Sequence, residues 1–237
     1  MMSARRLITT VAAMTVIIAL LTQFVFMQHG FVHEIYVRPQ SDGRSWLEWF
    51  DWYSIRSARR LVHNKKFFEI TAIFGLRGTV ISICLPILAW VSWRRRTWAP
   101  IAGFIIVLLF ETGLAGSMKM SMGREFPWQS WPRMGALRTG ELAFPSGHAT
   151  NVVALLGYMA WYFTKAGTAM RKVAWGLVTA ASITVSISSW LIRTHWPTDL
   201  AAGTAYGVIA LVTVIALLSA MGLNPSATAP HSPATHP

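Results

Sequence analysis

The sequence predicts an all-α, polytopic membrane protein with six transmembrane helices and an amphipathic interfacial helix between the first and the second. Of the 237 residues, 54% are hydrophobic and only 13% are charged, which is too apolar for a soluble domain. Apolar runs of roughly 20 residues, the length that crosses a bilayer, recur along the chain. Basic residues gather beside these runs, so the net charge of +12 indicates membrane flanks and not nucleic-acid binding.

The first predicted span follows Arg5 and Arg6 and covers Leu7–Met27. It is long enough to cross a bilayer and no small-x-small cleavage site follows it, so we interpret it as an uncleaved helix with a cytoplasmic N-terminus. Residues 28–66 are polar, basic and aromatic. Apolar residues recur there at spacings near three and four, which predicts an amphipathic helix on the bilayer surface; an ordinary packed loop helix fits equally well. These apolar residues are Trp46, Leu47, Trp49, Phe50, Tyr53, Leu61 and Val62.

The next two spans carry one charge each. Phe67–Trp93 forms the second span and contains Arg77, and the basic run Arg94–Arg96 then marks a cytoplasmic turn. Trp98–Met118 forms the third span and contains Glu111. A charge within a span costs roughly 2.5–3.5 kcal/mol, so both should face the bundle interior. Because Arg77 and Glu111 lie at similar depth below one face, we predict that they pair, in a structural role.

The remaining three spans are expected at His148–Phe163, Val173–Ile192 and Thr198–Met221. In the sixth span, Gly203 and Gly207 have the small-xxx-small spacing that lets helices pack closely. An even number of spans puts both termini on one side, and tight basic clusters at short turns indicate that this side is cytoplasmic. We therefore expect one domain over residues 1–221, followed by a disordered tail of biased composition over residues 222–237.

The start of the fourth span has the composition of an anion-binding site. Pro145 cannot continue a helix, Ser146 is a good N-cap, and Gly147 lets the backbone approach a ligand closely. The first amides of the helix are unpaired and carry partial positive charge, which favours an anion there. His148, beside these amides, can give a proton to the group that leaves the anion.

Two more polar segments, residues 119–127 and 193–199, are expected on the same, outer side of the membrane. They supply cations that would neutralise phosphoryl charge together with the amides near Ser146 and Gly147. These cations are Lys119, Arg124 and Arg193. Separately, each segment could be an ordinary turn with interfacial basic residues. Their convergence on one face of an otherwise apolar protein favours a functional site.

His195 and Asp199 lie four residues apart in the last of these segments. A carboxylate that accepts the Nδ1 proton of His195 would fix its tautomer and leave Nε2 free as a nucleophile. We expect no metal and no other cofactor, because this chemistry needs none and no cluster of histidines and carboxylates has convincing ligand spacing.

The three segments, in this order and on a six-helix background, resemble the type 2 phosphatidic acid phosphatase superfamily, which shares its core with vanadium haloperoxidases. The family's first motif is a lysine, six residues and Arg-Pro, and its second is Pro-Ser-Gly-His. The third is Ser-Arg, five residues, histidine, three residues and aspartate. The likeness covers residues from about 98 to 207. It implies that His195 forms a phosphohistidine intermediate, with His148 as acid and Asp199 as orienting partner.

The sequence departs from the family at two positions. Counting from Lys119, the arginine of the first motif falls on Phe126, and counting back from His195, the arginine of the third motif falls on Ser189. Arg124 and Arg193 lie close enough in sequence to supply the missing charges, and we expect them to replace the pair.

The resemblance implies a membrane lipid phosphatase whose substrate stays in the bilayer while its phosphate enters the site. Undecaprenyl diphosphate is the first choice of substrate, and phosphatidic acid or phosphatidylglycerol phosphate is next. Alternatives are a lipid-to-lipid phosphotransferase of the same fold and a catalytically silent protein that binds anionic lipid. We expect a bacterial inner-membrane protein with its site on the extracytoplasmic face and no nucleic-acid partner; the oligomeric state stays open.

Overall fold

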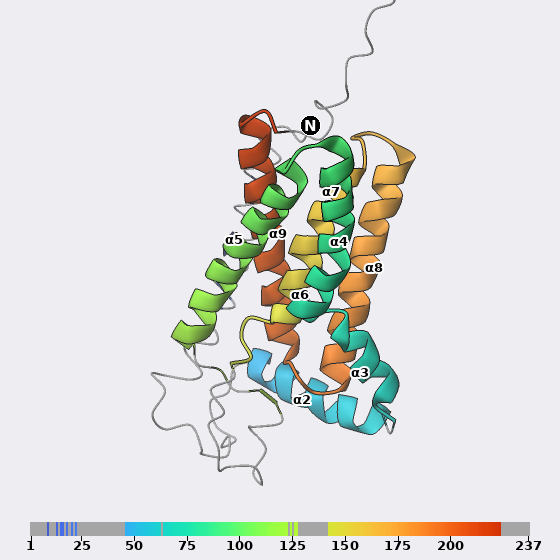
Figure 1. Cartoon of the computed structure of the whole chain (residues 1–237). Helices are drawn as coiled ribbons and strands as arrows, with labels where there is room; N and C mark the ends of the chain where they lie inside the picture. Colours follow the sequence, from blue (N-terminus) through green and yellow to red (C-terminus); the bar gives the residue numbers. More distant parts are fainter. Residues whose placement is uncertain are drawn as a thin grey trace, which may run out of the picture.

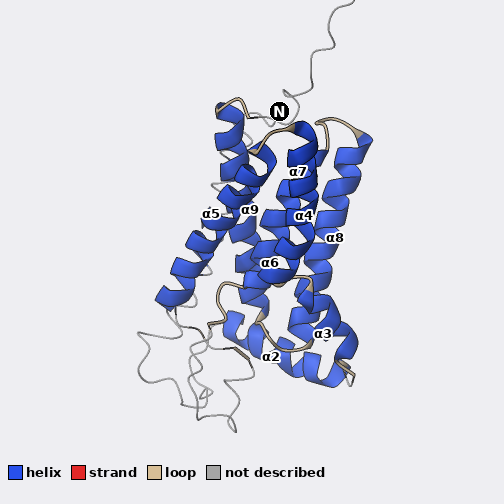
Figure 2. Ribbon diagram, viewed as in Figure 1, coloured by secondary structure: helices blue, strands red, loops and turns tan. Residues whose placement is uncertain are grey.

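The computed structural model describes residues 46–62, 64–122, 124, 126–127 and 142–223, with isolated positions at 9, 13, 15, 16, 18, 20 and 22. Every regular element in this part of the chain is a helix (Figure 2). The first predicted span is described only at those isolated positions, and the predicted tail lies outside the described residues from position 224 on. The six-span count therefore stays a prediction.

The described helices form a bundle with one helix lying across its end (Figure 1). Helices α4, α5, α8 and α9 and the run from α6 to α7 lie along the bundle, and α2 crosses it at the end where α9 begins. The elements are α2 Trp46–Leu61, α3 Lys66–Ile73, α4 Arg77–Arg95, α5 Ala99–Met122, α6 Gly147–Asn151, the π-helical turn η1 Val152–Leu156, α7 Gly157–Phe163, α8 Ala169–Leu191 and α9 Pro197–Ala220.

Among the described residues, three helices are long and apolar enough to cross a membrane, namely α5, α8 and α9. Helices α3 and α4 together would make a fourth span, but they are bent by 50° at the break between them. The predicted second span is therefore not one continuous helix. The fourth predicted span is a continuous helical run over residues 147–163, composed of α6, η1 and α7.

The break between α3 and α4 has a local cause at Gly75. A Cβ atom on this residue would lie 2.5 Å from the side chain of Val185 and 2.9 Å from Cβ of His148, so only glycine fits this close packing. The carbonyl of Gly75 accepts a hydrogen bond from Nδ2 of Asn151 (3.0 Å). This contact satisfies a buried backbone group at the break and ties it to α6.

The apolar core lies between α4, α5, the α6–α7 run and α9. Tyr158 is at its centre, 1% exposed, and its hydroxyl donates to the carbonyl of Pro100 at the start of α5 (2.9 Å). The buried residues around it include Val80, Leu88, Phe104, Val107, Leu155, Leu211 and Val214. This core fixes α5, α6 and α9 relative to one another, and these are the helices whose ends carry the predicted site.

Helix α2 packs on the bundle by a different face from the one whose apolar residues the sequence singled out. Asp51, Ile55 and Ala58 are buried against the bundle, whereas Phe50 and Tyr53 are 50% and 59% exposed. Its position on a bilayer surface stays a prediction, and the other half of the segment predicted to be interfacial, residues 28–45, lies outside the described residues.

The two glycines of the sixth span do bring helices together as predicted. A Cβ on Gly203 would lie 2.3 Å from the carbonyl oxygen of Ser146, and one on Gly207 would lie 2.8 Å from Cβ of Val153. Oγ1 of Thr150 donates to the carbonyl of Gly203 (3.0 Å), so α9 is bound to the start of α6 at this contact.

Replacing Gly203 by alanine should therefore destabilise the protein, because a methyl group against a backbone carbonyl forces α6 and α9 apart. We expect a loss of about 1–3 kcal/mol in the free energy of unfolding. The matched control is Gly176→Ala in α8, where a Cβ would meet nothing within 4 Å. Thermal unfolding of both variants in detergent checks this; an equal melting temperature for the two would contradict the packing account.

Candidate active site

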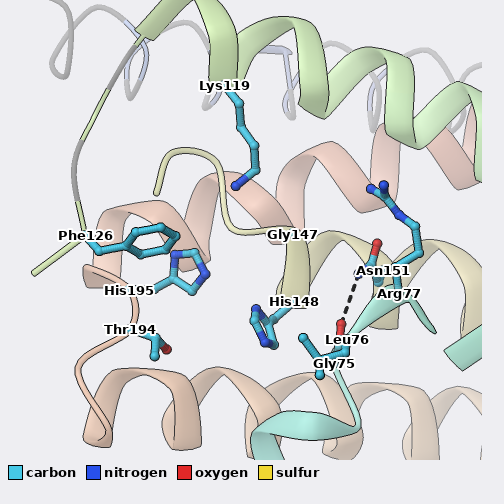
Figure 3. A pocket seen from close by; sticks show the side chains of 10 residues that line it. All are labelled: Gly75, Leu76, Arg77, Lys119, Phe126, Gly147, His148, Asn151, Thr194 and His195. Atoms are coloured by element: carbon cyan, nitrogen blue, oxygen red, sulfur yellow. Dashed lines mark hydrogen bonds between the residues drawn. The ribbon is translucent and has the colours of Figure 1, made fainter. Parts of the chain in front are cut away.

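A cavity of about 380 Å³ opens where the three predicted segments meet (Figure 3). Its volume lies in the lower part of the range for small-molecule sites, ~300–1,000 Å³. Lys119 reaches it from the end of α5, His148 from the first turn of α6, and His195 from the loop before α9. The lining residues are Gly75, Leu76, Arg77, Lys119, Phe126, Gly147, His148, Asn151, Thr194 and His195.

His195 lies in the turn between α8 and α9 with its ring 2% exposed. Its Nδ1 is 3.5 Å from Oδ2 of Asp199, which is within ion-pair distance but does not satisfy the geometry of a hydrogen bond. Asp199 is held in the first turn of α9, where the same Oδ2 accepts the backbone N–H of Trp196 (3.0 Å). The ring centroid of His148 lies 5.5 Å from that of His195. One histidine backed by a carboxylate and a second histidine therefore face one cavity.

Burial lowers the pKa of His195 from its usual value of 6.5, because the charged ring would lose its hydration. The negative charge of Asp199 and a backbone hydrogen bond with Ala143 act against this, and the positive charge of Lys119 adds to it. The net effect keeps the ring neutral, which is the form that can attack phosphorus.

The lowered pKa of His195 predicts where activity is lost at low pH. Because the neutral ring of His195 reacts and its pKa lies below 6.5, the loss of kcat/KM for phosphate release on the acidic side of the profile should begin only below pH 6.5. The proton that His148 must carry limits the basic side, so the whole profile should be bell-shaped. Steady-state rates between pH 4 and 9 on one lipid phosphate check this. Loss of half the activity above pH 6.5 on the acidic side would contradict it.

Lys119 lies on the cavity wall opposite the histidines. Its Nζ donates to the carbonyl of Leu142 (2.6 Å), just before the Pro-Ser-Gly-His segment. An ammonium has three donor hydrogens, so it can donate to this carbonyl and to a phosphoryl oxygen at the same time. The hydrogen bond fixes the position of the charge over the cavity.

Arg124, which the sequence predicts as a phosphate ligand, does not line the cavity. Its guanidinium is 3% exposed and bridges two carboxylates: one terminal nitrogen is 2.6 Å from Oδ1 of Asp199 and the other is 2.7 Å from Oδ2 of Asp51. Burial opposes its charge, but the two carboxylates outweigh this and raise the pKa of Arg124. Arg124 therefore lies behind Asp199 and not in the cavity lining.

Asp51 is a member of this network that the sequence prediction missed. Its Oδ1 accepts the backbone N–H of Thr198 (3.2 Å) and its Oδ2 accepts the Thr198 hydroxyl (2.6 Å). That hydroxyl also accepts from Arg124 (2.7 Å). Asp51 thus ties α2 to the first turn of α9. The signal was present in the sequence, because a carboxylate at Asp51 shares the apolar helix face with Ile55 and Ala58.

Arg193 and Ser146 also lie outside the cavity lining. Arg193 adopts a left-handed backbone, φ 65°, in the turn after α8. Burial and then the charge of Arg193 lower the pKa of Lys65, which places Arg193 near the start of α3. Ser146 is fully buried and caps α6, since its hydroxyl accepts from the amide of Ala149 (3.5 Å). Of the predicted phosphate-binding residues, Lys119 and Gly147 therefore line the cavity.

The two positions where the family has arginine are filled differently here. Phe126 lines the cavity and packs edge-to-face on His195, with ring centroids 5.2 Å apart. Ser189 is completely buried. Neither residue can supply positive charge to a phosphoryl group.

The predicted pair of Arg77 and Glu111 is confirmed, with Nε of Arg77 3.3 Å from Oε1 of Glu111. Arg77 also lines the cavity, which the sequence analysis did not anticipate. The reason is the break at residues 74–76: it places Arg77 at the start of α4 instead of inside a continuous span.

Within the described residues, no group of three or more histidines, cysteines, aspartates and glutamates could hold a metal ion. The cavity presents cations and imidazoles, which suit an anion. Chemically, the arrangement can bind a phosphoryl group, attack it with His195 and protonate the departing oxygen from His148.

Known proteins resemble this chain in sequence and in fold. The family model of the PAP2 superfamily matches residues 100–221, just over half of the chain. The fold is similar to that of the first transmembrane PAP2-type phosphatidylglycerolphosphate phosphatase from Bacillus subtilis, with a TM-score of 0.65 and 16% sequence identity. This likeness covers 86% of the present chain and 96% of the other. No curated protein sequence matches significantly.

Proposed function

Because the chain belongs to the PAP2 superfamily, we propose that it is a membrane lipid phosphatase that hydrolyses a lipid phosphate or an isoprenoid diphosphate through a phosphohistidine at His195. One observation carries the proposal: Lys119, His148 and His195, from three separate segments, line a single cavity. Membership of the family supports a lipid phosphatase, and these side chains would supply its chemistry.

In the first step, Nε2 of His195 attacks phosphorus while the bond from phosphorus to the leaving oxygen breaks. His148 gives its proton to that oxygen, so the lipid alcohol or lipid phosphate leaves protonated. Lys119 and the amides of Gly147 and His148 stabilise the charge on the phosphoryl oxygens. In the second step, His148 takes a proton from water, the oxygen of that water attacks phosphorus, and the bond to His195 breaks to release phosphate.

Asp199 supports both steps without touching substrate. Its carboxylate faces Nδ1 of His195 and favours the proton on that nitrogen, which leaves Nε2 with a lone pair. Arg124 keeps this carboxylate ionised and in place, and Asp51 holds Arg124 from its other terminal nitrogen. In this proposal Arg124 is a positioning residue.

We propose a substrate that remains anchored in the bilayer. The cavity opens near the end of the bundle that α2 crosses, and α2 presents exposed aromatic residues, Phe50 and Tyr53, of the type found at headgroup depth. Undecaprenyl diphosphate remains the first choice, with phosphatidic acid or phosphatidylglycerol phosphate next. The location in a bacterial inner membrane, with the site extracytoplasmic and both termini cytoplasmic, belongs to the same proposal.

A panel of lipid phosphates tests the proposal with purified protein. Phosphate release that survives a chelator and disappears in His195→Asn supports a metal-independent hydrolase. Transfer of phosphate to a second lipid would support the phosphotransferase alternative. Saturable binding without product would support the silent binder, an alternative favoured by Phe126 and Ser189 at the positions of the family's arginines.

A further inference from the structure

Arg77 is a cation in the cavity that the proposed reaction does not use. It is the first residue of α4, and its side chain is 43% exposed although its Nε is paired with Glu111. Glu111 itself is completely buried in α5. The Glu111 carboxylate therefore pairs with one nitrogen of the Arg77 guanidinium. The rest of the guanidinium is left to the cavity that Arg77 lines.

The position of Arg77 differs from that of Lys119 in depth. Glu111, which fixes Arg77, precedes Lys119 by two turns of α5, or about 12 Å along the helix axis. Lys119 lies in the last turn of α5, so Arg77, paired with Glu111, lies deeper along the bundle than Lys119 does. Figure 3 shows Phe126 and His195 on one side of the cavity and Arg77 on the other, with His148 between them.

The backbone at this side of the cavity is also suited to an anion. Helix α4 has 19 residues, and its N-cap residue Leu76 is extended and makes no side-chain cap hydrogen bond. The first amides of α4 therefore point outward from a helix end that carries partial positive charge. Gly75 and Leu76 line the cavity, which brings this helix end and the Arg77 guanidinium to the same place.

From these contacts we infer that Arg77 binds a second anionic group of the substrate, on the lipid side of the phosphoryl group that reacts at His195. The inference rests on the proposed function and narrows its substrate class. The substrate would carry two phosphates in series, as an isoprenoid diphosphate and phosphatidylglycerol phosphate do. Phosphatidic acid has no such second phosphate. In both two-phosphate lipids the terminal phosphate reacts and the inner one leads to the lipid, which matches the order of Lys119 and Arg77.

Two lipids that differ by one phosphate test this inference, namely farnesyl diphosphate and farnesyl monophosphate. Arg77→Gln should lower kcat/KM for the diphosphate by about 10- to 100-fold, the usual effect of losing a charge-assisted hydrogen bond, and that for the monophosphate by less than about threefold. Arg95→Gln is the matched control, because it removes the same charge from the opposite end of α4, where Arg95 contacts Tyr162. Equal losses on both substrates, or no loss on either, would overturn the inference.

Measuring the same variants on phosphatidylglycerol phosphate and phosphatidic acid distinguishes a second phosphate that belongs to a diphosphate from one that belongs to a phosphodiester. A selective loss on farnesyl diphosphate alone supports a diphosphate substrate, and one on phosphatidylglycerol phosphate alone supports a phosphodiester. Losses on both support the shared chemistry.

Arg77→Gln leaves Glu111 buried without its partner, so the double variant Arg77→Gln/Glu111→Gln is measured beside it to separate binding from folding. Binding of inorganic pyrophosphate and orthophosphate to the solubilised full chain gives a readout without turnover. Weaker pyrophosphate binding by both variants, with orthophosphate binding unchanged, supports the inference. If the wild type also releases no phosphate from any lipid, the proposed function fails but the inference stands. If the wild type releases phosphate and both variants still bind pyrophosphate in preference to orthophosphate, the inference is overturned and the proposed function is not.

Discussion

Replacing His195 by asparagine should lower phosphate release by about 10⁴-fold or more, because the substitution removes the nucleophile and leaves only binding and charge stabilisation. Asparagine is polar and smaller than histidine, so the ring-sized space beside Phe126 should persist. The measurement is kcat/KM on the best lipid phosphate from the panel. His148→Asn should cost less, about 10²–10⁴-fold, since it removes acid catalysis and not the nucleophile.

The two histidines also serve as controls for each other. Both lie in the same cavity and their ring centroids are 5.5 Å apart, so a general disturbance of the cavity would affect the two variants alike. Activity of His195→Asn within tenfold of the wild type would contradict the assignment of His195 as nucleophile. Equal and small losses in both variants would indicate that the cavity binds lipid without turnover.

Replacing Arg124 by alanine should have the second largest effect, on stability as well as rate. The change leaves Asp51 and Asp199 buried with no cation between them, and breaking a buried ion pair in this way costs about 3–5 kcal/mol. Burial already raises the pKa of Asp51 even though Arg124 opposes it, so this carboxylate depends on the guanidinium. Chemical unfolding and phosphate release are measured on the same preparation.

Two further variants determine which role Arg124 has. Arg124→Met/Asp51→Asn removes one uncompensated carboxylate together with the cation, so it should recover part of the lost stability. Arg56→Ala, on the exposed face of α2, should change stability by no more than about 0.5 kcal/mol. A loss of activity in Arg124→Ala with unchanged stability would contradict the buried network and favour the phosphate contact that the sequence suggested.

The sequence predicted well those features that depend on apolar runs and on the ends of helices. Helices α5, α8 and α9 lie close to the predicted third, fifth and sixth spans because each is an unbroken apolar run between polar turns. Lys119 lies at the end of α5, His148 at the start of α6 and His195 in the turn before α9. Span length and order place these three residues on one side of the bundle, and the packing of the helices brings them to one cavity.

The features that the sequence did not reveal depend on contacts between distant segments. Gly75 interrupts an apolar run without changing its hydropathy, and its close contact with His148 exists only in the packed bundle. The ion pair of Arg124 with Asp51 joins residues 73 positions apart, and spacing within the motif cannot indicate it. Proximity in sequence made Arg124 look like a replacement for the missing arginine, whereas the arginine that lines the cavity is Arg77.

The central claim is that a phosphoryl group becomes bonded to His195, and trapping this intermediate tests it most directly. The protein is incubated briefly with lipid labelled at the terminal phosphate, denatured in alkali and digested, and the labelled peptide is identified. The account predicts a label that is stable in alkali and lost in acid, as for a phosphohistidine, on the peptide containing His195 and absent from His195→Asn. A label on another residue, or continued phosphate release by His195→Asn, would contradict it.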